Sequence, residues 1–264
     1  MIARIATAAV GIPVFLAAVW AGGWWFAGVI ALLAGIGYWE YARLWRAQGI
    51  DVAAALGIPA AAGVVLAAHG WPGPGPGALL TSATLAFLAR AVLRFHPDSA
   101  RGALLGVAGV GYVGGLFAHF VLLRDREPGG LWLVVFGLAI TWAADSVAYF
   151  AGLAWGRRRL APALSPGKSV EGAVAGIAAG VAAGALLGEV AGLEPGWIGA
   201  ALGAVLAFGG VVGDLAESAI KRHAGVKDSG GLFPGHGGVL DRFDSALFTV
   251  PLLYYAALFL GVGR

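Results

Sequence analysis

Cysteine is absent from this chain of 264 residues, and charged residues are scarce. The lack of cysteine excludes disulfides and thiolate chemistry, so a bound metal must be held by carboxylate, carbonyl or imidazole groups. Aspartate, glutamate, lysine and arginine make up 12% of the sequence, about half of the share that soluble domains carry. A chain so poor in charge is not expected to fold as a soluble domain.

Apolar residues account for 59% of the chain, and the mean hydropathy is +0.84. The sequence also contains 45 glycines, and small residues allow membrane helices to approach one another closely. Tryptophan, with 10 residues, suits anchoring at the membrane surface. These features predict an all-α integral membrane protein, built as a polytopic helix bundle. We expect the lipid bilayer, and not nucleic acid, to surround it.

Apolar runs that could cross the hydrocarbon core of a bilayer recur along the whole chain. Each crossing needs about 20 residues, and we expect about nine transmembrane helices. They are predicted at Ile5–Ala21, Trp24–Trp39, Val52–Ala68, Leu79–Leu93, Ala103–Leu123, Leu131–Ala154, Val170–Val190, Trp197–Leu215 and Ser245–Gly261. The second run is short and the third contains Pro59, so one span more or fewer is an alternative. About five spans fall in an N-terminal region, 1–128, and about four in a C-terminal region, 129–264.

Lysine and arginine are distributed unequally between the loops on the two sides of these spans. With an odd number of spans, most of the 17 lysines and arginines fall on the side of the N-terminus. Cytoplasmic loops of membrane proteins carry this excess. We therefore predict a multi-pass protein of a bacterial-type inner membrane, with a cytoplasmic N-terminus, a cytoplasm-facing active site and the C-terminus outside.

The segment from Asp214 to Asp244 collects a large share of the chain's charges between two almost wholly apolar runs. Its first polar residues, Asp214, Glu217, Ser218 and Lys221, are spaced so that they share one face of a helix. A carboxylate near the end of a membrane span is costly unless it is paired or binds a cation. A charged helix end that simply reaches water is the alternative.

The middle of this segment is basic and rich in glycine. Glycines let backbone N–H groups approach an anion, and cations neutralise it, so the composition favours phosphate binding. The P-loop pattern G-x-x-x-x-G-K-[ST] does not occur, and for the basic residues alone an ordinary cytoplasmic loop is the commoner explanation. The candidate phosphate ligands are Lys221, Arg222, Lys227 and Arg242, and His236 either binds a phosphate or orients the turn.

Two aspartates, Asp241 and Asp244, complete the segment at the start of the last apolar run. They could form the acidic first turn of a helix. Together with Asp214 they also offer carboxylate oxygens from two helices. Mg²⁺ is typically bound by one or two carboxylates and by substrate phosphates, so this set predicts a magnesium site.

Two further candidates precede the segment. Asp145 lies inside the sixth apolar run, where an acidic residue is a functional candidate by default and a buried ion pair is the alternative. The stretch Ser165–Gly172, S-P-G-K-S-V-E-G, opens the seventh run. Ser169 could cap that helix, and Lys168 beside a helix N-terminus favours an anion, although a plain start of a span is an equal alternative.

The stretch Ser218–Asp244 resembles the signature of the phosphatidate cytidylyltransferases, also called CDP-diacylglycerol synthases. It contains the pairs K-R and K-D, followed by P-G-H-G-G and D-R-x-D in fixed register. The resemblance extends to D-S-V-A-Y-F at Asp145, S-P-G-K-S-V-E-G at Ser165 and G-D-L-x-E-S at Gly213. It therefore covers the C-terminal half by motif, and the N-terminal half by hydropathy and the order of spans.

This sequence departs from the family pattern at a few positions. Gly167 stands where a lysine is expected, and Ser146 and Ser169 replace threonines. The serines are conservative changes. Gly167 removes one cation from the nucleotide site that the resemblance implies.

The resemblance implies a Mg²⁺-dependent reaction in phospholipid biosynthesis, in which CTP and phosphatidate give CDP-diacylglycerol and pyrophosphate. It also implies a two-metal centre and suggests a homodimer. The implied metal ligands are Asp214 and Asp241, with Asp244 and Asp145 in or beside the shell. The implied catalytic residues are Asp214, Asp241, Asp244 and Lys221. The implied substrate-binding residues are Lys168, Glu171, Ser218, Arg222, Lys227, Asp228, His236 and Arg242.

The alternative functions come from two classes. A CTP-dependent lipid-alcohol kinase or another lipid cytidylyltransferase is the nearest enzyme. A CDP-alcohol phosphotransferase would show D-G-x-x-A-R, which is absent. An ion-coupled membrane transporter could use Asp145 and Arg90, but it leaves the loop rich in glycine, histidine and aspartate unexplained.

Overall fold

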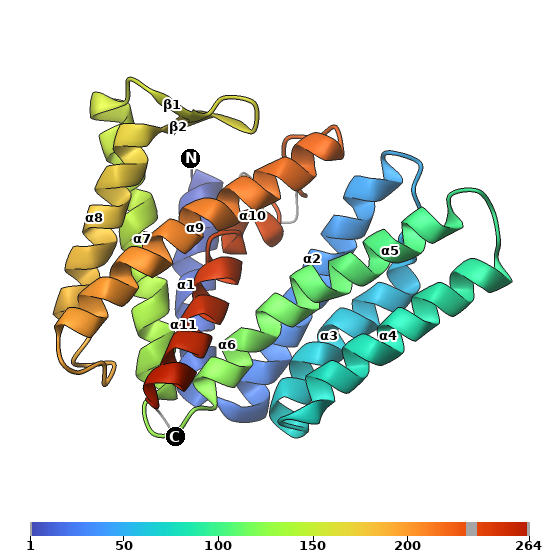
Figure 1. Cartoon of the computed structure of the whole chain (residues 1–264), viewed down its shortest axis with the longest axis horizontal. Coiled ribbons are helices and arrows are strands. Elements are labelled where there is room, and N and C mark those ends of the chain that lie inside the picture. The colour runs from blue at the N-terminus through green and yellow to red at the C-terminus, as the bar shows by residue number, and fades with distance from the viewer. Residues whose placement is uncertain (1, 231–236, 263–264) are drawn as a thin grey trace. The chain divides into compact units, whose positions relative to one another are not determined.

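The computed structural model describes residues 2–230 and 237–262, with side chains from residue 11 onward. The described chain is almost entirely helical, apart from one two-stranded sheet (Figure 1). It forms two compact units. Unit 1 comprises Met1–Asp125 and Lys221–Arg242, and unit 2 comprises Arg126–Ile220 and Phe243–Arg264. Neither unit is continuous in sequence, because the chain passes from unit 2 to unit 1 and back again near the C-terminus.

Unit 1 is built mainly from the N-terminal helices. They are α1 (Ile2–Ala21), α2 (Gly23–Arg46), α3 (Ala54–Gly70), α4 (Pro74–Leu93), α5 (Ser99–Gly109), the π-helical η1 (Val110–Gly115) and α6 (Leu116–Arg124). The segments α5, η1 and α6 follow one another without a break, and α3 packs against α2, α4 and η1. The short α10 (Leu240–Phe243) joins this unit through its first three residues.

Aromatic side chains of α2 fit against glycines of the neighbouring helices in unit 1. The fully buried ring of Tyr38 occupies the space that a Cβ at Gly57 would need. Its hydroxyl lies 3.0 Å from the carbonyl oxygen of Val52 and 3.2 Å from that of Gly106, and its single proton is shared between these two acceptors. Small residues thus permit close helix packing here, as the glycine content predicts.

Unit 2 is built from long C-terminal helices and a hairpin. They are α7 (Gly130–Trp155), β1 (Arg159–Ala161), β2 (Ser165–Ser169), α8 (Val170–Leu187), α9 (Trp197–His223) and α11 (Ala246–Leu260). The strands pair antiparallel, and α9 enters unit 1 with its last three residues. This hairpin was not predicted from the sequence, and its second strand carries Lys168.

Helices α8 and α9 meet backbone to backbone through glycines. A Cβ at Gly180 or Gly184 would contact the backbone of Gly203 or Gly199, and the converse also holds. On its other side α8 approaches α7 in the same way, since a Cβ at Gly176 would lie 2.8 Å from the carbonyl oxygen of Ala144. The absence of side chains at these positions sets the spacing of the helices in unit 2.

Each predicted span coincides with a helix among the described residues, and the all-α polytopic membrane fold is confirmed. In that part of the chain, 6 helical segments are long and apolar enough to cross a membrane. They are Gly23–Arg46, Pro74–Leu93, Ser99–Arg124, Gly130–Trp155, Val170–Leu187 and Trp197–His223, and Gly11–Ala21, Ala54–Gly70 and Ala246–Leu260 are shorter. The number of crossings and the division at residue 128 stay predictions.

Candidate active site

Helix α9 brings the first polar residues of the charged segment onto one element. It continues to His223 without a break, so Asp214, Glu217, Ser218 and Lys221 belong to a single helix, as their spacing predicts. Glu217 and Ser218 are buried. Gly213 lets the chain before α11 pass close to α9, because a Cβ there would lie 2.5 Å from the carbonyl oxygen of Asp244.

Unit 2 holds a group of charged residues that we name the acid cluster: Asp145, Lys168, Asp214 and Asp244. Lys168 Nζ lies 2.5 Å from Asp214 Oδ2 in an ion pair whose side chains are about a quarter exposed. Ser218 Oγ donates to Asp214 Oδ1 at 3.4 Å. Asp145 lies near Lys168 and Asp214 and forms a hydrogen bond with Ser245. Helix α7, strand β2, helix α9 and the turn before α11 therefore bring their charges together.

Negative charge is in excess in the acid cluster, and Asp244 shows the effect. Burial, together with the neighbouring carboxylates of Asp214 and Asp145, raises the pKa of Asp244 to about 7. The backbone N–H of Ser245, which donates to Asp244 Oδ1 at 2.6 Å, and the charge of Lys168 oppose this rise. A bound cation would relieve the same repulsion.

The donor set of the acid cluster fits a hard cation in part. Within residues 2–230 and 237–262, no three His, Asp or Glu side chains converge closely enough to form a metal-binding group. Mg²⁺, however, requires only one or two carboxylates when substrate phosphates and water complete its shell. Asp214 and Asp244 are of the right chemical type for such a site.

A second group of residues in unit 1, which we name the loop clamp, consists of Glu40, Lys221, Ser229 and Asp241. Asp241 Oδ1 accepts a hydrogen bond from Lys221 Nζ at 2.6 Å. Its Oδ2 accepts from the Ser229 N–H at 3.1 Å, Ser229 Oγ at 2.9 Å and the Gly238 N–H at 2.8 Å. Burial alone would raise the pKa of Asp241, but these donors and the charge of Lys221 outweigh it and lower the pKa.

Glu40 is a member of the loop clamp that the sequence analysis missed. The second span was predicted to end at Trp39, but α2 continues to Arg46 and Glu40 is fully buried. Its Oε1 accepts a hydrogen bond from the Val239 N–H at 2.9 Å, and its Oε2 from the Leu240 N–H at 3.0 Å. The signal that could have revealed it is the one acidic residue of α2, which directly follows a long apolar run.

Two further predicted site residues of unit 2, Ser169 and Glu171, lie at the end of the hairpin and the start of α8. Ser169 caps α8, because its Oγ accepts from the Gly172 N–H at 3.1 Å, as predicted. Glu171 accepts from the N–H groups of Arg157, at 3.0 Å, and Arg158, at 3.1 Å, so it ties the end of α7 to the start of α8. That Glu171 positions the nucleotide or a metal-bound water stays a prediction.

The other predicted substrate ligands lie around the segment that follows α9. Arg222, Lys227, Asp228 and Arg242 have exposed side chains, and Arg222 donates to the carbonyl oxygen of Val226 at 3.3 Å. His236 lies outside the described residues. Since the acid cluster and the loop clamp belong to different units, their union in one metal centre stays a prediction.

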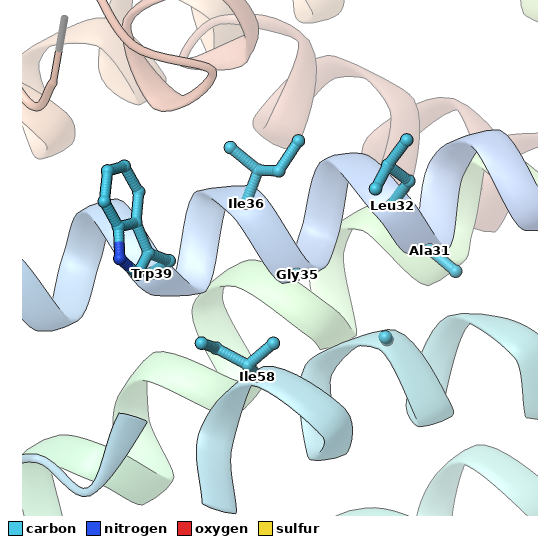
Figure 2. Close-up of a pocket in the computed structure, with 7 residues that line it drawn as sticks. Ala31, Leu32, Gly35, Ile36, Trp39 and Ile58 are labelled. Atoms are coloured by element: carbon cyan, nitrogen blue, oxygen red, sulfur yellow. The ribbon is translucent and has the colours of Figure 1, made fainter. Parts of the chain in front are cut away.

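Unit 1 also has a groove between α2 and α3 that, unlike the acid cluster and the loop clamp, is lined by apolar residues (Figure 2). Its lining residues are Ala31, Leu32, Gly35, Ile36, Trp39, Ile58 and Ala62. The guanidinium of Arg43 lies 4.7 Å from the centre of the Trp39 ring. The groove itself offers no polar side chain that could take part in group transfer.

Comparison with known proteins connects this geometry to a chemistry. The model of the Cytidylyltransferase family matches residues 2–260. A phosphatidate cytidylyltransferase of Synechocystis sp. is 36% identical over 288 residues, which cover 97% of this chain and 96% of the relative. One of Pseudomonas aeruginosa is 37% identical over 278 residues, covering 98% and 97%. One of Bacillus subtilis is 40% identical over 145 residues, 54% of each chain.

The family match spans both units and includes every residue of the acid cluster and the loop clamp. The resemblance that the motifs between Asp145 and Asp244 indicate is therefore confirmed. This chain belongs to the cytidylyltransferase family.

Proposed function

We propose that this protein is a phosphatidate cytidylyltransferase, which transfers CMP from CTP to phosphatidate and so makes CDP-diacylglycerol and pyrophosphate. The observation that carries the proposal is the similarity to proteins of that name over nearly their whole length, at 36% and 37% identity. The stretch Ser218–Asp244, in the register of that family's signature, supports the same substrates.

The reaction is a displacement at the α-phosphorus of CTP. A phosphate oxygen of phosphatidate forms a bond to this phosphorus, the bond between the α-phosphorus and the bridging oxygen to the β-phosphate breaks, and pyrophosphate leaves. The attacking oxygen is already anionic, so no strong base is required. The main obstacle is repulsion, since like charges about 4 Å apart repel by roughly 4 kcal/mol at an effective dielectric constant near 20. Catalysis then depends on positioning and charge neutralisation.

Basic residues in each unit would supply positive charge for this task. Lys168 of the acid cluster stands beside the capped N-terminus of α8, a favourable environment for a phosphate. The exposed Arg222, Lys227 and Arg242 would bind the phosphates of CTP and of the lipid. Lys221 would orient Asp241 through the 2.6 Å contact. Ser218, Glu171, Asp228 and His236 complete the proposed substrate-binding set.

Magnesium is the proposed cofactor, as one ion or as a two-metal centre. Asp214 and Asp241 would hold it, with Asp145 and Asp244 in or beside the shell. When bound, it would neutralise phosphate charge on CTP and on the departing pyrophosphate. The excess of negative charge in the acid cluster, which contributes to the raised pKa of Asp244, favours a cation there.

The proposal also places the protein in the membrane. The apolar helices make it a multi-pass membrane protein. The excess of lysine and arginine in alternate loops favours a cytoplasmic N-terminus and active site, and a C-terminus outside. A homodimer is consistent with the small-residue faces of the helices.

One assay tests the proposal against its rivals. The purified protein is mixed with phosphatidate, radiolabelled CTP and Mg²⁺, and the label in the lipid phase is followed together with pyrophosphate. We expect lipid-soluble CDP product and pyrophosphate in equal amounts, and neither product when diacylglycerol replaces phosphatidate. A lipid-alcohol kinase would release CDP and a phosphorylated lipid, and a transporter would give neither, so both results would contradict the proposal.

A further inference from the structure

Two short stretches of unit 1 converge on the side chain of Glu40. Ser229–Gly230 and Gly238–Leu240 flank residues 231–236, which are not among the described residues. A Cβ at Gly230 would lie 2.7 Å from Glu40 Oε1, and a Cβ at Gly238 would collide with both oxygens of the carboxylate. The two glycines therefore leave the room that the Glu40 carboxylate fills.

The carboxylate of Glu40 binds the backbone of the second stretch with both oxygens, and it also forms a hydrogen bond with the side chain of Ser229 in the first stretch. One oxygen accepts from the Val239 N–H at 2.9 Å and the other from the Leu240 N–H at 3.0 Å, while the side chain is 0% exposed. A buried carboxylate is costly unless hydrogen-bond donors compensate it. An apolar residue in its place would leave two buried N–H groups without these acceptors. The position therefore requires an acceptor with two oxygens.

Glu40 and Asp241 both bind these two stretches, although Glu40 lies far before them in the sequence and Asp241 directly after them. Glu40 binds the N–H groups of Val239 and Leu240, the two residues that precede Asp241. Asp241 in turn accepts from the N–H groups of Ser229 and Gly238. The backbone that aims the Asp241 side chain is thus fixed by a residue of α2, about 200 positions earlier in the chain.

We propose that Glu40 is a positioning residue for cytidylyl transfer: its buried carboxylate fixes the start of α10 and thereby the orientation of Asp241. The inference rests on the proposed function for its activity readout. Glu40 is hydrogen-bonded to the two residues that precede Asp241, so its effect reaches the reaction through Asp241. Helix α2, in the N-terminal half of the chain, would thus have a role in the reaction, whereas the motifs that carry the family resemblance lie in the C-terminal half.

The test compares Glu40→Gln with Tyr38→Phe, a matched control on the same helix. The glutamine keeps the size of the side chain but turns one acceptor into an NH₂ group that faces a backbone N–H. Tyr38→Phe removes the buried hydrogen bonds to Val52 and Gly106 and leaves the loop clamp untouched. For both variants, kcat, the KM for CTP, the melting temperature and amide hydrogen exchange at Val239 and Leu240 are measured in the full-length protein.

We expect Glu40→Gln to lower kcat about 10- to 100-fold, because small displacements of a reacting group cost factors of that size. The KM for CTP should change much less, and exchange at Val239 and Leu240 should accelerate while amides of α3 keep their protection. Tyr38→Phe should lower the melting temperature and leave kcat within about 3-fold of the unmodified protein. Glu40→Asp, which keeps both oxygens on a shorter side chain, should restore part of the lost kcat.

Three results would overturn the inference. They are a normal kcat in Glu40→Gln, unchanged exchange at Val239 and Leu240, or an equal loss of kcat in Tyr38→Phe at an equal fall in melting temperature. If the unmodified protein makes no CDP-lipid, the proposed function fails instead. Hydrogen exchange needs no turnover, so it still decides in that case whether Glu40 holds the start of α10.

Discussion

Asp244 of the acid cluster and Asp241 of the loop clamp are aspartates in opposite electrostatic states. In the loop clamp, Asp241 is surrounded by a lysine, a hydroxyl and two backbone N–H groups, and its pKa is lowered. In the acid cluster, Asp244 lies near two other carboxylates and its pKa is raised to about 7. Donors therefore outnumber carboxylates in one region and fall short in the other. The first region is suited to fix the backbone that orients Asp241, and the second has an excess of negative charge that favours a cation.

The largest effect is expected from removing a charge of the acid cluster. Asp214→Asn breaks the ion pair with Lys168 and removes a proposed metal ligand, so turnover should fall by about 100- to 1,000-fold. The rate of CDP-lipid formation measures it. Asp125→Asn, which alters an acid paired with His69 in unit 1, is the control and should keep normal turnover. Near-normal turnover in Asp214→Asn would contradict a catalytic role for the acid cluster.

Chelation tests whether the excess negative charge serves a cation. Complete removal of divalent metal by EDTA should stop CDP-lipid formation, and added Mg²⁺ should restore it. The melting temperature of the chelated protein, followed in parallel, distinguishes loss of a cofactor from unfolding. Turnover that persists after complete chelation would exclude a metal from the reaction.

Lys221→Met tests the loop clamp from its basic side. It leaves the carboxylate of Asp241, whose side chain is 9% exposed, without its ion partner, and the expected loss of unfolding free energy is about 3 kcal/mol. Denaturant unfolding at pH 7 measures this loss. A change of under about 0.5 kcal/mol would show that the ion pair contributes little.

The same variant should change the dependence of stability on pH. Because the pKa of Asp241 is lowered from its ordinary 3.8, its contribution to stability is present above pH 3.8 and is lost as the pH falls through the lowered value. The melting temperature of the unmodified protein should therefore drop below pH 4, and that of Lys221→Met should drop less steeply. Parallel curves of melting temperature against pH for the two proteins would show that the Lys221–Asp241 pair is not the origin of the pH dependence.

The smallest effect is expected at Gly167, where the family pattern has a lysine. A Cβ at this position meets nothing within 4 Å, so Gly167→Lys adds a cation near Lys168 without a steric conflict. The KM for CTP should fall by about 2- to 5-fold, the size of one exposed charge interaction. Gly167→Ala is the matched control and should leave the KM unchanged. An equal change in both variants would show that the added charge has no part in nucleotide binding.

Apolar runs and helical spacing predict most of what unit 2 contributes to the site. They place Asp214 and Ser218 on one helix and Ser169 at the cap of α8, because these relations depend on neighbours in sequence. The hairpin that carries Lys168 escapes prediction, since strands of three and five residues leave little pattern. The contact of Glu40 with Leu240 escapes it for a stronger reason. It joins residues about 200 positions apart, and local periodicity carries no information about such pairs.

The glycine contact between α8 and α9 limits how this protein can change. Gly184 of α8 and Gly199 of α9 touch through their main chains. Gly199 lies several turns before Asp214 on α9. An added methyl group at either position would have to push the two helices apart. Because α9 is one continuous helix from Trp197 to His223, such a displacement would be passed along its axis to Asp214, the carboxylate that pairs with Lys168. A substitution that alters no charge, several turns from Asp214, would therefore change the position of the carboxylate on which the proposed reaction depends.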